Sequence, residues 1–346
     1  MTLLEIAIPT YNRPTQLERL LQSIRLQNCP DIFQKVSIAV YDNSLHINHA
    51  AEESLKQLAA LGCRTSYVKN PKNIGVGANI AQAYARSSAA WTVVVGDDDY
   101  FMPFSISRIL AHIEEAESAD VGLIQLGFVC IDDQYVVRFV HPRFSREKRF
   151  FSPSDAIVAE GCVHDLSFIS SLVVRSSIWS EEAHKTHDKP TQLYAHVFCL
   201  LDGLRAANLK AMCIDEHLVF AGYGRNDYYS SKVAVSRLSE FPAYDRLALS
   251  LGPVARSRKY REYRSQRFRR LKLDINAALK IGAFRDSSYK AHVHLIKDPQ
   301  SPFWPSSLSC RAIYLLTLFP WIRGLLKRLY SSSNPGKDLS DVDSLV

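Results

Sequence analysis

The chain has 346 residues, of which 47% are hydrophobic and 22% are charged, and it carries a formal net charge of +7. This composition indicates a globular protein with a substantial core and excludes an intrinsically disordered chain. No apolar run reaches the roughly 18 residues that cross a bilayer, and a strand pattern begins within the first eight residues. We therefore expect neither a spanning helix nor a signal peptide. The seven cysteines are odd in number and form no C-x-x-C pair, which favours reduced thiols in a cytoplasmic protein.

Strand and helix patterns alternate four times in the first hundred residues. Apolar runs predict strands over residues 3–8, 36–41, 64–68 and 91–95. Apolar residues at helical spacing predict three helices. The first begins at Pro14, the second is closed by Gly62, and the third spans residues 78–86. This alternation predicts an α/β fold with a mostly parallel sheet, right-handed crossovers and helices on both faces.

The patterns after residue 100 are more mixed, and no internal repeat is visible. We predict a helix over 104–117, a strand over 121–129, a hairpin partner over 134–140, a strand over 168–174, a buried helix over 194–206 and short strands over 211–214 and 218–221.

Each of the first four strands ends in polar or acidic residues. These are Thr10 and Asn12, Asp42 and Asn43, Asn70 and Asn73, and Asp97 to Asp99. Ligands of open α/β sheets bind outside the carboxyl ends of the strands. The four strand ends are therefore predicted to share one crevice.

The three consecutive carboxylates Asp97, Asp98 and Asp99 directly follow the apolar run of residues 91–95. Adjacent acids repel one another and are costly to bury, but a divalent cation would neutralise them. Hard oxygen ligands select Mg²⁺ or Mn²⁺, which also takes phosphate oxygens from a substrate. The pattern therefore predicts a metal–diphosphate site at this strand end. The alternative is a polar turn that contains a helix cap.

Four motifs carry a resemblance to a known family. They are the segments Pro9 to Pro14, Asp42-Asn43-Ser44, Asn73-Ile74-Gly75 and Asp97-Asp98-Asp99. In order and spacing they are similar to the motifs of family 2 glycosyltransferases with the GT-A fold. The resemblance covers about residues 3–225 and is strong over 3–103. It implies transfer of a sugar from a nucleotide diphosphate donor, generally with inversion at the anomeric carbon.

The resemblance also implies roles for single residues. The nucleotide pocket is expected to be lined by Pro9, Tyr11, Asn12 and Arg13. Asp42 would accept a hydrogen bond from the base, commonly uracil, and Asn73 and Gly75 would shape the loop near the nucleotide, with Asn79 behind it. For the acidic trio two registers stay open. If Met102-Pro103 is aligned with the family's frequent apolar-Pro pair, Asp97 lies near the ribose and Asp98 holds the metal; read simply as D-x-D, Asp99 holds it.

The general base is harder to assign, because the family's usual Glu-Asp pair is absent from residues 184–196. Three candidates are Asp188, the nearest acid; His196, at the start of the buried helix; and Asp165, before the predicted strand 168–174. For each of them a surface or capping role is the alternative. The Arg225-Asn226-Asp227 segment could close over the diphosphate or the acceptor, or be a simple loop.

The positive charge is concentrated near the C-terminus, since residues 256–272 hold nine Lys or Arg and one Glu. Residues 303–330 then mix apolar and aromatic side chains with Arg and Lys, which favours a helical segment on a membrane surface. The alternatives are a solvated helical face, a segment that binds nucleic acid, and a helix that simply packs on the catalytic domain. We expect a catalytic domain over 1–230, a basic amphipathic helical extension over 231–330 and a disordered tail over 331–346.

Together these features predict a metal-dependent glycosyltransferase with a nucleotide sugar donor, most commonly a UDP-sugar, and a glycan or lipid-linked saccharide acceptor. The resemblance and the anchor argument suggest surface polysaccharide synthesis at the inner face of the plasma membrane. One alternative is a sugar-nucleotide nucleotidyltransferase, which would normally carry a Gly-rich basic loop after the first strand. The other is a nucleic-acid-binding module that uses residues 256–272, but no recognised motif of that class is present.

Overall fold

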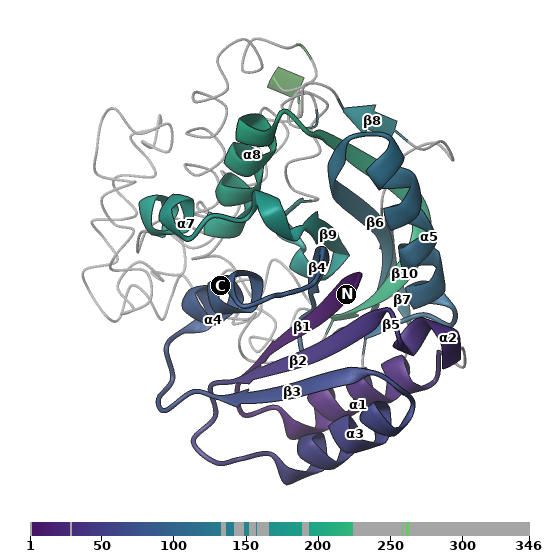
Figure 1. Ribbon diagram of the computed structural model, residues 1–346, viewed down its shortest axis with the longest axis vertical. Coiled ribbons are helices and arrows are strands. Elements are labelled where there is room, and N and C mark those ends of the chain that lie inside the picture. The colour runs from purple at the N-terminus through teal and green to yellow at the C-terminus, as the bar shows by residue number, and fades with distance from the viewer. Residues whose placement is uncertain are drawn as a thin grey trace, which may run out of the picture. The chain divides into compact units, whose positions relative to one another are not determined.

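The computed structural model describes residues 2–27, 30–132, 136–141, 149–151, 157, 166–188, 194–223, 258 and 261–262. Nearly all of them belong to one compact unit, residues 1–190 and 194–224 (Figure 1). The predicted boundary at residue 230, the extension over 231–330 and the tail lie outside the described residues, apart from Arg258, Arg261 and Glu262.

The first half of the unit is the predicted alternation of strands and helices. Its elements are β1 (Leu4–Thr10), α1 (Pro14–Arg25), α2 (Pro30–Phe33), β2 (Val36–Asp42), α3 (His49–Ala60), β3 (Arg64–Lys69), α4 (Val76–Ala85) and β4 (Trp91–Val94). β1 pairs in parallel with β2 and with β4, and β2 pairs in parallel with β3. The carboxyl ends of these strands therefore meet at one edge of the sheet, as predicted.

Local sequence explains where these helices begin and which face they bury. α1 starts at Pro14, whose missing N–H is no loss at a first helical position, and it buries Leu17, Leu20, Leu21 and Ile24. α3 is capped by Asn48, whose side chain accepts a hydrogen bond from the backbone N–H of Ala51 at 3.2 Å.

The second half of the unit comprises β5 (Tyr100–Phe101), α5 (Ser105–Ser118), β6 (Val121–Asp132), β7 (Val137–His141), β8 (Arg149–Phe151), η2 (Ile169–Ser171), β9 (Leu172–Arg175), η3 (Ser176–Ile178), α7 (Glu181–His187), α8 (Ala195–Ala207) and β10 (Lys210–Tyr223). Two differences from the predicted elements stand out. The segment 168–174 begins with the 3-10 turn η2 before its strand, and the two short strands predicted over 211–221 form one strand, β10, with register shifts.

The sheet order is β3-β2-β1-β4-β9-β6-β10-β5, with β7 on β6 and β8 on β10. The sheet is parallel over β1–β4 and mixed beyond, because β9 lies antiparallel between β4 and β6. Beyond β4 only the β6–β10 pair is parallel among the described strands. Because β9 runs antiparallel to β4, the η2 turn that precedes β9 lies at the carboxyl end of β4.

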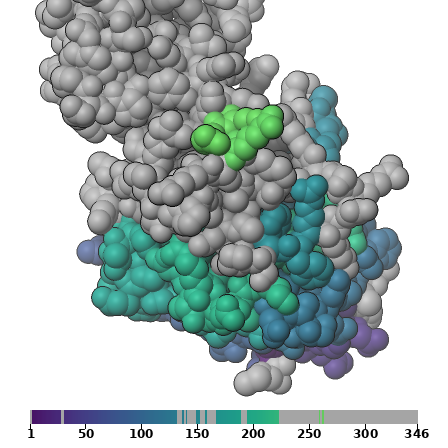
Figure 2. All heavy atoms as spheres, turned by 90° about the horizontal axis from the view of Figure 1, so that it is seen from above, coloured from purple at the N-terminus to yellow at the C-terminus, as the bar shows by residue number. Residues whose placement is uncertain are grey.

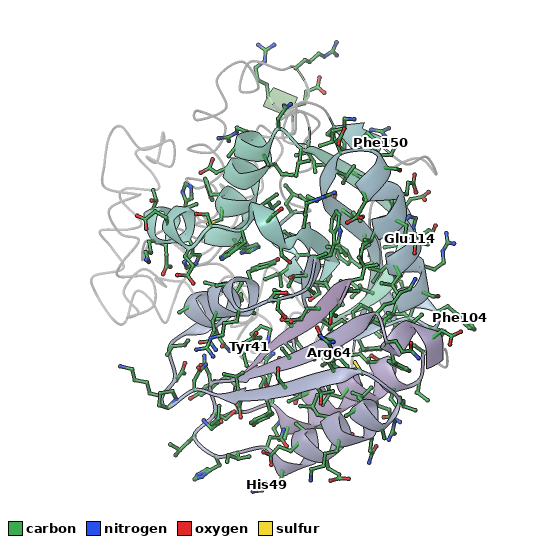
Figure 3. All side chains as sticks on the ribbon, in the orientation of Figure 1. Tyr41, His49, Arg64, Phe104, Glu114 and Phe150 are labelled. Atoms are coloured by element: carbon green, nitrogen blue, oxygen red, sulfur yellow. The ribbon has the colours of Figure 1, made fainter. Side chains whose placement is uncertain are left out.

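Helices cover both faces of the sheet. Figure 1 shows α1, α3 and α5 on one side and α4, α7 and α8 on the other. Trp91, Val93 and Val94 of β4 are fully buried, as expected for a strand covered on both faces. α5 starts after Phe104, which points outward with 67% of its surface exposed, and Glu114 of the same helix pairs with Lys35 at 3.4 Å (Figure 3). In Figure 2 the teal to green segment, between about residues 170 and 210, forms a broad part of the described surface. Among the described residues, we find no helix with the length and apolarity to cross a membrane.

Candidate nucleotide-sugar site

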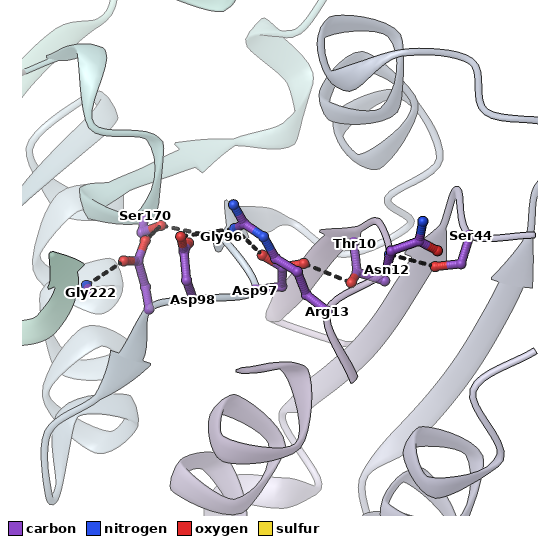
Figure 4. A network of polar contacts seen from close by, with 10 residues as sticks. Thr10, Asn12, Arg13, Ser44, Gly96, Asp97, Asp98, Ser170 and Gly222 are labelled. Atoms are coloured by element: carbon purple, nitrogen blue, oxygen red, sulfur yellow. Dashed lines mark hydrogen bonds and ion pairs between the residues drawn. The ribbon is translucent and has the colours of Figure 1, made fainter. Parts of the chain in front are cut away.

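Polar side chains from the ends of β1, β2 and β4 meet at the carboxyl edge of the parallel strands. The hydroxyl of Thr10 donates to Oδ2 of Asp97 at 2.7 Å, which ties the end of β1 to the loop after β4. Arg13, one residue before α1, places one guanidinium nitrogen 3.0 Å from Oδ1 of Asp97 and 2.9 Å from Oδ2 of Asp98 (Figure 4). The end of β1 and the loop after β4 therefore meet, as predicted for these two of the four strand ends.

The three acids of the loop have different surroundings. Asp97 is buried, and both of its oxygens are occupied by Thr10 and Arg13. Asp99 is also buried; it accepts hydrogen bonds from the hydroxyl of Ser170 at 2.5 Å and from the backbone N–H of Gly222 at 3.0 Å. Asp98 is the most open of the three, with 34% of its side chain exposed.

These surroundings shift the acidity of the buried acids. Burial, together with the charge of Asp98, raises the pKa of Asp97, although the hydrogen bond from Thr10 and the charge of Arg13 oppose the shift. Burial and the charge of Asp98 raise the pKa of Asp99 well above its ordinary value. Asp98, the most exposed of the three, is the carboxylate that a ligand can reach most easily.

The loop that carries Asp97, Asp98 and Asp99 (the acidic loop) is held in place by residues of η2 and β10, which belong to the second half of the unit. Ser170, in the η2 turn, accepts a hydrogen bond from the N–H of Gly96 at 2.9 Å while it donates to Asp99. A Cβ atom on Gly222 of β10 would lie 2.3 Å from the carbonyl oxygen of Asp98, so only glycine allows this approach of the backbones. Neither contact has a local signal in the sequence, because each joins segments that are far apart along the chain.

A pocket of about 250 Å³ lies beside the carboxylates. It is lined by Thr10, Asn12, Arg13, Pro14, Asp42, Ser44, His46, Ile47, Asn48 and His49. The structure therefore brings three of the predicted nucleotide-binding residues, Asn12, Arg13 and Asp42, to the same pocket. Pro9 and Tyr11 belong to the same end of β1, where Pro9 is half-buried and Tyr11 is 49% exposed, but they do not line this pocket.

Asp42 is held by hydrogen bonds to both of its oxygens. The backbone N–H of Ser44 donates to Oδ1 at 2.7 Å and the hydroxyl of Tyr67 to Oδ2 at 2.5 Å. Tyr67 in turn accepts from the N–H of Asn48 at 3.0 Å. The sequence reasoning missed Tyr67; the available signal was a tyrosine near the end of the strand that follows Asp42.

The loop before α4 is anchored by a buried amide network. Asn70 donates to the side-chain oxygens of Asn43 at 2.8 Å and Asn79 at 3.2 Å, and Asn79 donates to the carbonyl of Tyr41 at 2.9 Å. Asn73 and Gly75 form the exposed part of this loop. Oδ1 of Asn73 accepts from the N–H of Gly75 at 2.8 Å, and Gly75 has a φ of +89°, which glycine adopts readily.

The structure places two of the three candidate general bases, Asp188 and His196, in different surroundings. Asp188 is exposed at the end of α7, and a Cβ atom on Gly77 would lie 3.8 Å from its Oδ1 atom, which places the carboxylate beside the first turn of α4. His196 is buried in α8, and burial lowers its pKa to about 4. Asp165 and the segment 225–227 lie outside the described residues.

The acidic loop fits a divalent cation only in one way. The described residues contain no group of three His, Cys, Asp or Glu side chains arranged to hold a metal ion. Asp98 nevertheless has an oxygen, Oδ1, that makes no hydrogen bond or ion pair within the described part of the chain. Mg²⁺ is commonly held by one or two carboxylates together with substrate phosphates and water. Within the described residues, the arrangement therefore fits a cation shared with a bound diphosphate rather than one held by protein ligands alone.

The fold is an α/β domain of the GT-A type, with a polar pocket at the carboxyl ends of β1 and β2. Residues 5–169 match the sequence model of the family described as Glycosyl transferase family 2. The match covers the chain from β1 to η2, slightly less than half of its 346 residues.

The chain is also similar to two kinds of relative. The chain is 22% identical over 242 residues to the uncharacterized glycosyltransferase MJ1057 of Methanocaldococcus jannaschii, a match that covers 69% of this chain and 77% of that protein. The crystal structure of S. aureus TarS 1–349 is 14% identical, with a TM-score of 0.50, and the match covers all of this chain and 90% of that one. The complex of the same fragment with UDP-GlcNAc has 14% identity, a TM-score of 0.51 and the same coverage. The chain spans 55% of the length of a longer TarS chain. At these identities the likeness to TarS bears on the fold.

Proposed function

We propose that this protein transfers a sugar from a nucleoside diphosphate sugar to a saccharide acceptor. One observation carries the proposal: Arg13 contacts the carboxylates after β4 and also lines the pocket that contains Asp42. A nucleoside diphosphate sugar needs these two features side by side. Its base and ribose require a polar pocket, and its diphosphate requires a cationic and metal-binding edge next to that pocket.

A UDP-sugar is the first donor to consider. Asp42 has a fixed orientation and would accept the N3–H of uracil on a lone pair that its two present donors leave free. That TarS has been crystallised with UDP-GlcNAc lends support to this choice.

We further propose that Mg²⁺ or Mn²⁺ assists the reaction through Asp98, with Asp97 close to the ribose. A divalent cation bound there would neutralise the negative charge that develops on the diphosphate leaving group. Asp98 would hold it with an oxygen that the protein leaves open, whereas both oxygens of Asp99 are already occupied. We therefore favour Asp98 over Asp99 as the ligand.

For an inverting single displacement we favour Asp188 as the general base. A base must be accessible to the acceptor hydroxyl and must have a pKa that suits proton abstraction. Asp188 is exposed beside the first turn of α4. His196 is buried, and a pKa of about 4 makes its neutral ring a weak base. We expect Asp188→Asn to lower kcat at least about 100-fold with little change in KM for the donor, and His196→Gln to act mainly on stability.

The acceptor side of the proposal depends on the C-terminal sequence. We propose a lipid-linked or oligosaccharide acceptor, a role in surface polysaccharide synthesis and attachment to the inner face of the plasma membrane through residues 256–330. The basic segment 256–272 and the aromatic residues beyond it support this proposal. Cosedimentation of the full chain with vesicles that contain phosphatidylglycerol, but not with phosphatidylcholine alone, is the expected result at 0.1 M salt.

The activity is tested with a panel of UDP, GDP, CDP and dTDP sugars, with Mn²⁺ or with EDTA. We expect release of a nucleoside diphosphate that depends on the metal and is lost in Asp98→Asn. Asp31→Asn is a matched control, because Asp31 is an exposed acid in the first turn of α2. If no nucleotide sugar of the panel is turned over and none of the nucleoside diphosphates binds in calorimetry, the proposed function is wrong.

A further inference from the structure

Arg13 occupies the position at the carboxylates that a cation would take. A single guanidinium nitrogen lies 3.0 Å from Oδ1 of Asp97 and 2.9 Å from Oδ2 of Asp98, so it bridges the two acids (Figure 4). An arginine side chain is always protonated in proteins, and its charge is therefore present at every physiological pH.

The bridge is partly open to solvent, which allows it to be exchanged. Arg13 has 28% of its side chain exposed and Asp98 has 34%, whereas Asp97 has 7%. Asp97 also keeps a second donor, Thr10, if the guanidinium leaves. The contact to Asp98 is thus the one that a ligand can replace at the smaller cost.

We propose that Arg13 changes partners when the donor binds: it holds Asp97 and Asp98 in the free protein and binds the diphosphate in the complex. This inference rests on the proposed function. A free divalent cation must displace a positive charge from Asp98, so it binds weakly. A cation that arrives with a diphosphate brings phosphate oxygens that accept the released guanidinium in its place. Arg13 therefore makes the acidic loop selective for a cation–diphosphate pair over the cation alone.

The pocket supports the second half of this exchange. Arg13 lines it together with Thr10, Asn12 and Asp42, so a side chain that turns from the carboxylates stays within the same cavity. Like charges near a bound cation also favour this turn, because Arg13 and the cation repel each other at Asp98.

The test measures Mn²⁺ binding by electron paramagnetic resonance, with and without UDP, in the full-length wild type and in Arg13→Gln. In the absence of UDP we expect Arg13→Gln to bind Mn²⁺ at least about tenfold more tightly, because the competing charge is gone. In the wild type we expect UDP to strengthen Mn²⁺ binding strongly, and in the variant this coupling should shrink by a similar factor. UDP alone should bind the variant more weakly than the wild type.

Two further variants make the comparison specific. Arg25→Gln removes the same charge from the exposed last turn of α1, and it should leave both affinities unchanged. Arg13→Lys keeps a charge without the planar fork and should give an intermediate Mn²⁺ affinity. Circular dichroism checks that each variant is folded. If Arg13→Gln does not fold, the same Mn²⁺ measurements are made on Arg13→Lys instead.

The outcomes separate this inference from the proposed function. Equal Mn²⁺ affinities of the wild type and Arg13→Gln without UDP, alongside normal UDP binding, would overturn the exchange of partners and leave the proposed function standing. Failure of every nucleoside diphosphate to bind either protein would overturn the proposed function and the exchange with it.

Discussion

Thr10 and Asp97 are 87 residues apart in the sequence, yet the hydroxyl of Thr10 donates to the Asp97 carboxylate at 2.7 Å in a buried contact. Thr10 is the last residue of β1 and Asp97 lies in the loop after β4, the parallel neighbour of β1, so the bond joins the end of one strand to the loop of the other. Arg13 then completes the arrangement from the same loop as Thr10. The β1 loop therefore sets the position of the acidic loop.

We predict that Thr10→Val destabilises the protein by about 1–3 kcal/mol, because a buried carboxylate oxygen loses its donor while the side chain keeps its shape. Urea unfolding measures this change. Thr65→Val is the control, since Thr65 is a half-buried strand residue of β3 away from the carboxylates. If Thr10→Val lowers the free energy of unfolding no more than Thr65→Val does, the hydrogen bond from Thr10 to Asp97 contributes little to stability.

We predict that Tyr67→Phe weakens the binding of UDP about five- to tenfold and leaves the binding of inorganic pyrophosphate unchanged. The phenol holds Asp42 and accepts from the N–H of Asn48, so its loss loosens the pocket for the base but not the diphosphate edge. Calorimetry with both ligands measures the difference.

Tyr84→Phe provides the matched control for this prediction. Its hydroxyl is buried without a hydrogen-bond partner among the described residues, and its ring stacks on Trp179 with centroids 4.5 Å apart. Equal losses of UDP and pyrophosphate affinity in Tyr67→Phe would argue against a role in orienting Asp42.

We predict a pH-dependent stability difference between the wild type and Asp99→Asn. Burial raises the pKa of Asp99 in the folded protein, so the folded state binds a proton that the unfolded state releases above the ordinary value of 3.8. The wild type therefore loses stability relative to Asp99→Asn as the pH rises from about 4, by about 1.4 kcal/mol per pH unit while folded Asp99 stays protonated. Urea unfolding of both proteins at pH 4, 5, 6 and 7 measures it. A constant difference over this range would contradict the raised pKa.

We predict that Gly222→Ala destabilises the protein by about 1–3 kcal/mol and also lowers the affinity for UDP with Mn²⁺. The new methyl group would meet the carbonyl oxygen of Asp98 at 2.3 Å, so β10 and the acidic loop must move apart. Thermal unfolding and calorimetry measure the two effects.

Gly77→Ala serves as the control, because its Cβ atom has no contact closer than 3.8 Å and alanine is the better helix former in α4. It should leave stability unchanged or raise it slightly. Unchanged stability in Gly222→Ala would mean that the two backbones separate at little cost.

The sequence by itself determined the α/β alternation of the first hundred residues, because the periods of strands and helices are local properties of the chain. It also determined that Thr10, Asn12, Asp42 and Asp97 gather at one edge, since parallel strands present their carboxyl ends together. The family resemblance pointed to the same residues.

Only the tertiary structure decided how the three acids differ. Asp99 is held by Ser170 and Gly222, which are 71 and 123 residues away, and those contacts depend on β9 and β10 taking their places in the sheet. Strand order arises from long-range packing that local patterns do not encode, so the antiparallel insertion of β9 was not predicted. The same packing leaves Asp98 partly open beside Arg13, and this difference in burial is what distinguishes three identical side chains.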